Sequence, residues 1–173
     1  MLPCLILLGI AFGVLAKAGD VSGHGDIIRE IFSSFGTVST GVFIWAVVCT
    51  IIAVLSPNKV LAAVNVFLFL SAAIISYYLY SYFVVHYFVW RIAKFWLIML
   101  VPSMILGFIV WHVKVSRVLK YLTIIFGTLI MIYDIFFLQG GITPISLIMN
   151  MILYVIFLVF LISASSKKIE TDL

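Results

Sequence analysis

Charged side chains are scarce in this chain: Asp, Glu, Lys and Arg together make up 9% of its 173 residues, whereas hydrophobic residues make up 66%. The mean hydropathy is correspondingly high, at +1.37. A soluble domain covers its surface with polar side chains, and about a quarter of its residues are charged. This composition therefore excludes an ordinary water-soluble protein, so the function must be carried out in, across or on a membrane.

Cysteine is also rare, and Cys4 and Cys49 fall within or at the ends of apolar segments rather than in loops. No CxxC pair and no Cys/His spacing typical of zinc occurs, so neither a disulfide framework nor a structural metal site is supported. A phosphate-binding nucleotide loop is missing as well. We therefore expect no enzyme activity, no catalytic residues, no metal and no cofactor.

The chain does contain long apolar runs. About 20 apolar residues are needed for a helix to cross the hydrocarbon core of a bilayer. Backbone groups in lipid must satisfy one another, and the runs lack the alternation of membrane strands. We therefore predict an all-α fold, a compact bundle of about six transmembrane helices that forms one domain over residues 1–173. The predicted spans are 2–18, 36–55, 60–81, 95–113, 118–138 and 144–163.

Short polar links separate neighbouring runs. Residues 56–59 read Ser-Pro-Asn-Lys, a turn in which proline ends one helix. Residues 139–143 form another link, and Pro144 follows at a position where the first turn of a helix tolerates it. Such short connections predict antiparallel neighbours. No Lys or Arg precedes the first run, so we expect that run to be retained as a span rather than cleaved as a signal.

The distribution of Lys and Arg between the loops predicts the orientation, because cytoplasmic loops carry the excess. Six of these residues fall on one side of the predicted bundle and four on the other. We therefore expect a multi-pass protein of the cell membrane with both termini in the cytoplasm. The net charge of +4 suits an anionic cytoplasmic leaflet and calls for no nucleic-acid partner. The first group is Lys59, Lys114, Arg117, Lys120, Lys167 and Lys168, and the second is Lys17, Arg29, Arg91 and Lys94.

Several short segments resemble a family of small bacterial integral membrane proteins of unknown function. The resemblance covers roughly the first two thirds of the chain and implies a compact multi-span fold, without an activity or a ligand. It is carried by the segments 13–20 (GVLAKAGD), 52–57 (IAVLSP), 62–69 (AAVNVFLF) and 77–81 (YYLYS), by Trp90 and Pro102, and by 110–114 (VWHVK).

Two polar residues fall inside the last two predicted spans. Asp134 lies about four residues before the end of its run, and Asn150 lies six residues after Pro144. At 1.5 Å per residue these depths are roughly 6 and 9 Å, so the hairpin should bring both side chains into one layer near the outer side. Other side chains expected near that layer are Arg91, Lys94, His86, Tyr133 and Gln139.

This polar layer has two interpretations. Ionisable groups inside a membrane usually face the bundle interior and mark functional sites. Alternatively, Asp134 forms a structural ion pair with Arg91 or Lys94, and Asn150 contributes an interhelical hydrogen bond worth about 1 kcal/mol. Under the first interpretation the candidate ligand-binding residues are Asp134, Asn150, Arg91, Lys94, His86 and Tyr133.

Small residues and one proline suggest local features. Gly9 and Gly13 form a GxxxG pattern that predicts packing against another helix, within the bundle or on a separate membrane subunit. We expect a short amphipathic helix over 27–35. The uncharged segment 33–41 is either a helix that packs closely or an unwound stretch beside a polar cavity. Pro102 should kink the fourth span and free carbonyls that face a cavity.

Two functional classes remain. The first is a small-molecule binding or transport component, resembling in size and span count a substrate-capture subunit of an ATP-driven importer, whose ATPase would be a separate chain. The second is a structural or accessory subunit of a membrane complex with no ligand of its own. A cavity would favour the first class and a solid core the second.

Overall fold

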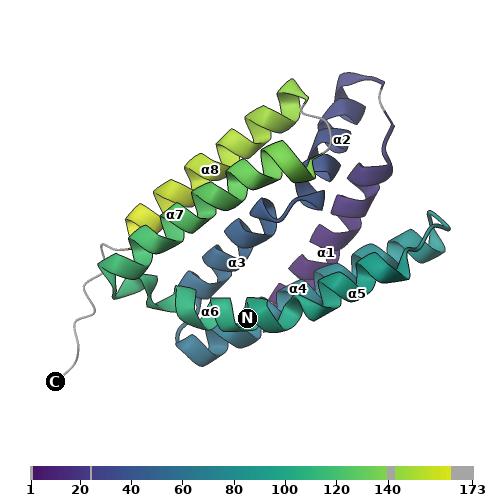
Figure 1. The fold of residues 1–173 in the computed structure, drawn as a ribbon. Coiled ribbons are helices and arrows are strands. Elements are labelled where there is room, and N and C mark those ends of the chain that lie inside the picture. The colour runs from purple at the N-terminus through teal and green to yellow at the C-terminus, as the bar shows by residue number, and fades with distance from the viewer. Residues whose placement is uncertain (1, 24, 140–142, 165–173) are drawn as a thin grey trace.

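The computed structural model describes residues 2–23, 25–139 and 143–164, and every regular element in these ranges is a helix (Figure 1). The predicted all-α fold is confirmed. Five helical segments in these ranges are long and apolar enough to cross a membrane, and the count is six if a bent pair of helices is taken as one broken span. The five are α1 (Leu2–Val21), α4 (Lys59–Phe83), Trp90–Lys114, Arg117–Leu138 and α8 (Pro144–Ala164).

The second predicted span, 36–55, is not one helix. It is divided between α2 (Ile27–Thr40) and α3 (Phe43–Leu55), whose axes differ by 74°. The amphipathic segment expected at 27–35 continues without interruption to Thr40. The chain breaks at Gly41 and Val42, where Gly41 has extended backbone angles and lies against the Asp134 carboxylate. The segment 33–41 is therefore helical almost to its end, and its last residue forms the break.

The fourth span is also interrupted. It consists of α5 (Trp90–Ile98), α6 (Leu100–Val110) and a short 3-10 helix, η1 (Trp111–Lys114). Pro102 has no N–H to donate to the carbonyl of Ile98, four residues earlier, and the break falls next to that carbonyl, at Met99. The fifth span begins as α7 (Arg117–Tyr133) and ends in a π-helix, η2 (Asp134–Leu138).

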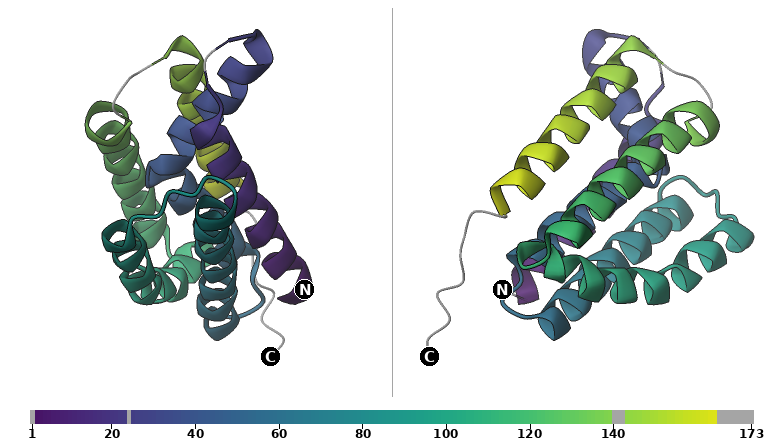
Figure 2. Two further views of the ribbon diagram at one scale, coloured as in Figure 1. Left: turned by 90° about the vertical axis from the view of Figure 1, so that its right-hand side faces the viewer. Right: turned by 60° about the vertical axis from the view of Figure 1, so that its left-hand side comes forward.

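The helices form two neighbouring groups that share α3. The first core cluster joins α1, α3 and α4, and the second joins α3 with α7 and α8. Figures 1 and 2 show α7 beside α8 and the fourth span beside α4. A hydrogen bond of 2.8 Å between the Thr128 and Tyr154 hydroxyls links α7 to α8.

Glycines on α1 set its distance from α4. Gly9 lies against the backbone of Phe69 and Ala73. A methyl group at Gly13 would overlap the carbonyl oxygen of Ala73 and the hydroxyl of Ser76. The structure thus places the GxxxG pattern inside the bundle, against α4.

Candidate functional site

The break between α2 and α3 is held by the carboxylate of Asp134. The backbone N–H of Val42 donates to Asp134 Oδ1 over 2.9 Å, and the N–H of Phe43 donates to Oδ2. Asp134 is fully buried, at 0% exposure, and it belongs to η2 at the end of the fifth span. One acidic side chain therefore joins the fifth span to the middle of the broken second span.

Physical chemistry explains why an acid stands here. The first N–H groups of a helix have no partner within the helix, and the helix dipole adds partial positive charge at the same point. No water is available inside a membrane to satisfy such groups. The carboxylate of Asp134 supplies both the acceptors and the negative charge. The other side of the break is fixed as well, because the Trp45 indole N–H donates to the carbonyl of Ser39 over 2.9 Å.

A second polar cluster lies next to this contact. The amide groups of Gln139 and Asn150 form a reciprocal pair, with N···O distances of 3.3 and 2.9 Å. Asn150 also donates to the carbonyl of Ser146, and the backbone N–H of Gln139 donates to the carbonyl of Asp134. Both amide side chains are buried. These bonds use most of the polar capacity of the cluster within the protein itself.

Only part of the predicted polar layer is assembled. Asp134, Asn150 and Gln139 are brought together, as the depths in the sequence suggested. In the part of the chain that the structure describes, the single salt bridge joins Lys17 to Asp20, so neither Arg91 nor Lys94 pairs with Asp134.

The other four predicted site residues lie elsewhere. The Lys94 ammonium lies 5.3 Å from the centre of the Trp90 ring, and Arg91 is exposed on the same helix, α5. His86 is exposed in the loop before α5, and Tyr133 is half exposed and stacks on Phe137. The acid and the amides thus bond to groups of the protein itself, and Asp134 acts as a brace across the helix break.

A different part of the bundle contains a cavity of about 470 Å³. Its wall is formed by α3, α4, α5, α6 and α7, and Phe157 of α8 also lines it. This volume falls in the usual range for ligand pockets, roughly 300–1,000 Å³. Its lining includes Ala46, Cys49, Met99, Ser103, Leu106, Thr123 and Phe126.

The cavity lining is almost entirely apolar. Ser103 and Thr123 line it, but their hydroxyls donate to carbonyls of their own helices, Leu100 and Leu119, over 2.7 and 2.8 Å. Those hydroxyl protons are thus already donated to backbone carbonyls and are not available to a ligand. The cavity therefore favours a ligand, or a part of a ligand, that makes van der Waals contacts and few hydrogen bonds.

The cavity is long in the direction of the helices. On the fourth span its lining runs from Phe95 to Val110, which is about 22 Å at 1.5 Å per residue. On α7 it runs from Leu119 to Ile130, which is about 16 Å by the same rise. An elongated apolar space of this kind matches an extended hydrocarbon chain better than a compact polar metabolite.

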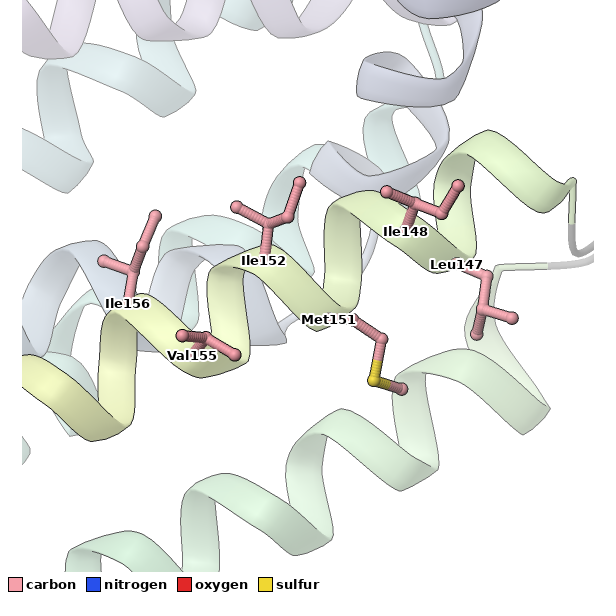
Figure 3. Close-up of a pocket in the computed structure, with 6 residues that line it drawn as sticks. All are labelled: Leu147, Ile148, Met151, Ile152, Val155 and Ile156. Atoms are coloured by element: carbon pink, nitrogen blue, oxygen red, sulfur yellow. The ribbon is translucent and has the colours of Figure 1, made fainter.

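A second apolar hollow, of about 400 Å³, differs in kind because α8 alone lines it (Figure 3). Figure 3 shows its side chains, among them Ile148, Met151 and Ile152, spread along the surface of one helix. A hollow with a single wall cannot enclose a ligand. This strip is therefore the lipid-facing side of α8.

Sequence reasoning found one element of the cavity and missed the rest. Pro102, whose kink predicted a nearby cavity, does line it. Gly107 and Gly127 also line it, but each packs closely on one side, against Val66 and Phe157 respectively. Apolar residues that line a cavity have the same chemical character as those that face lipid, so no signal in the sequence could separate them.

Comparisons of the chain with protein-family models, with curated proteins and with solved structures found no match. The resemblance to a family of small bacterial membrane proteins thus stays a prediction. Functional inference therefore depends on the geometry of the bundle alone.

Proposed function

We propose that this integral membrane protein binds one long-chain lipophilic molecule in the cavity between α3, α4, α5, α6 and α7. It would act as the binding or transport component of a membrane system, in the manner of a substrate-capture subunit. The observation that carries the proposal is the elongated, almost wholly apolar cavity of about 470 Å³. Any energy-coupling ATPase would be a separate chain.

Access from the bilayer suits such a ligand. Large apolar side chains are exposed on α6 and α7, two of the helices that border the cavity, including Ile105 on α6 and Ile125 and Leu129 on α7. These surfaces would face hydrocarbon in a membrane. A lipophilic molecule dissolved in the bilayer would then enter sideways between α6 and α7 without crossing water.

The alternative is a structural or accessory subunit without a ligand. It is supported by the internal bonding of Asp134 and Asn150, whose polar groups already bond to groups of the protein itself. Docking of a partner through the GxxxG pattern has no support, because Gly9 and Gly13 already pack on α4. The cavity makes the binding role the better supported of the two.

The orientation proposed from the loop charges places both termini in the cytoplasm. Lys59, Lys114, Arg117 and Lys120 then lie on the cytoplasmic side. We expect a reporter fused at Leu173 that is active only in the cytoplasm to be active, and one inserted between Ser22 and Gly23 to be silent. The reverse pattern would contradict this orientation.

Filling the cavity should abolish ligand retention. Ala46→Phe and Ser103→Phe each place a ring in the cavity, so we expect the amount of lipid that co-purifies per chain to fall about tenfold or more. Native mass spectrometry of protein purified in mild detergent measures that amount directly.

Ile148→Phe and Ile152→Phe are the matched controls, because they add the same ring to the α8 surface outside the cavity (Figure 3). We expect both controls to retain lipid at the wild-type level. A folded Ala46→Phe protein that still carries the wild-type amount of bound lipid would contradict the proposed function.

A further inference from the structure

We propose that the ligand of the cavity is an anionic amphiphile, a long apolar chain that ends in a phosphate, and that Lys114 and Lys120 bind this phosphate. The inference rests on the proposed function and names its substrate class. It follows from the charge at one end of the bundle and from the position of that end relative to the cavity.

Basic residues gather where α4 and α7 begin. Lys59 starts α4, Lys114 ends η1, and Arg117 and Lys120 lie in the first turn of α7. The 3-10 helix η1, which precedes α7, contacts the turn before α4. The Trp111 indole and the Lys114 ammonium both donate to the carbonyl of Ser56 in that turn, over 3.0 and 2.8 Å. Four cations from three segments are thus held at one end of the bundle.

This positive charge is not neutralised by acids within residues 2–23, 25–139 and 143–164. The acids of these ranges are Asp20, Asp26 and Glu30, near the α1–α2 connection, and Asp134 beside the helix break. All four lie at the ends of the spans opposite to the basic turns. Within the described ranges the basic cluster is uncompensated, and such a cluster at a membrane interface attracts anionic headgroups.

The cations at this end touch neutral groups. Lys114 donates to the Ser56 carbonyl, and Lys120 donates to the Ile162 carbonyl over 3.4 Å. Lys59 lies over the Phe108 ring, 5.3 Å from its centre. An ammonium group has three donors, so each lysine can keep its present contact and still bind a phosphate oxygen.

The cavity reaches this end of the bundle. Val110 and Leu119 line it, and Lys114 follows Val110 by four residues. Lys120 follows the lining residue Leu119, and its ammonium reaches the Ile162 carbonyl of α8. A chain that occupies the cavity with its headgroup at this end would therefore bring that headgroup to the turns that carry both lysines, with the length of the cavity accommodating its hydrocarbon.

Arg117 provides an internal control. It precedes Leu119 by two residues, which is about 200° around a helix at 3.6 residues per turn. It thus carries the same charge at the same end but points away from the helix face that lines the cavity. A general attraction to the anionic leaflet would involve Arg117 as much as the two lysines, whereas a headgroup site at the cavity would not.

The test titrates lipids into the purified full-length protein and counts bound molecules by native mass spectrometry. Dioleoyl phosphatidylglycerol and dioleoyl phosphatidylcholine have the same chains and differ only in the headgroup, which sets their net charge. A polyprenyl phosphate distinguishes an isoprenoid source of the phosphate from a glycerolipid source. We expect wild type to bind one of the two anionic lipids about tenfold more tightly than phosphatidylcholine.

The variants separate a headgroup site from a general field. Lys114→Gln with Lys120→Gln should remove this preference while leaving the binding of phosphatidylcholine unchanged. Arg117→Gln, and Lys94→Gln at the opposite end of the fourth span, should preserve it. Lys114→Arg with Lys120→Arg retains the charge and should also preserve it, which checks for misfolding of the Gln variant.

The outcomes are distinct for the two proposals. Equal binding of all the lipids that is lost in Ala46→Phe would overturn the anionic headgroup and leave the proposed function intact. If Arg117→Gln lost the preference for anionic lipid as fully as the Lys114→Gln, Lys120→Gln variant, the headgroup site would also be overturned. A general electrostatic attraction to anionic lipid would then explain the preference. Absence of any bound lipid in wild type would overturn both.

Discussion

Asp134→Ala is expected to lower the free energy of unfolding by about 3–6 kcal/mol, because it leaves the N–H groups of Val42 and Phe43 without acceptors. Each hydrogen bond to a charged group is worth about 1.5–3 kcal/mol, and no water inside a membrane replaces it. Reversible unfolding of the purified protein in mixed detergent micelles measures the change. Asp134→Asn should fall between wild type and Asp134→Ala, because an amide offers one acceptor oxygen where the carboxylate offers two.

Asp26→Ala is the matched control for this prediction. Asp26 also stands at the start of a helix, α2, but its side chain makes no capping hydrogen bond. We therefore expect its replacement to change the stability by less than about 0.5 kcal/mol. If Asp134→Ala were as stable as Asp26→Ala, the role of Asp134 as the brace of the broken span would be refuted.

Gly13→Leu is expected to prevent α1 from packing on α4, at a cost of about 3 kcal/mol or more. Even the first carbon of the new side chain would overlap the Ala73 carbonyl oxygen and the Ser76 hydroxyl. The Ala73 oxygen belongs to the backbone of α4 and cannot move without bending that helix. We expect a large fall in the yield of monodisperse protein on size-exclusion chromatography.

Gly23→Leu tests whether this effect is local. No atom lies within 4 Å of the position that a Cβ would take at Gly23, so we expect the yield of this variant to equal that of wild type. A Gly13→Leu protein with wild-type yield and melting temperature would show that the close approach of α1 and α4 is not needed for folding.

The fold was predictable because the length and the hydrophobic composition of a segment are sufficient to identify a membrane span. The apolar runs and the polar links at 56–59 and 139–143 were sufficient to predict an all-α bundle. The break at Gly41 was not predictable in the same way. Its stability comes from Asp134, more than ninety residues later in the chain, and a window of local sequence contains no information on such a distant partner.

The sequence anticipated the position of the polar cluster and, in one of its two interpretations, a structural role, but not the partner of Asp134. Asp134, Gln139 and Asn150 were expected in one layer from their depths, and the structure brings them together. The expected partners of Asp134 were the basic side chains of Arg91 and Lys94, since an acid in a membrane needs compensation. Backbone N–H groups at a helix start supply that compensation equally well, yet every residue except proline carries one, so the sequence does not mark them.

The most direct test of lipid binding in the cavity is photocrosslinking with a lipid that carries a diazirine in its acyl chain, followed by peptide mapping of the labelled protein. The account predicts labels on residues from at least two walls of the cavity, such as Ala46 or Cys49 of α3 together with Thr123 or Phe126 of α7. It also predicts that excess unlabelled lipid competes for these labels and not for those on Ile148 and Ile152 of α8. Labels confined to the outer faces of the helices, with none on α3, would contradict it.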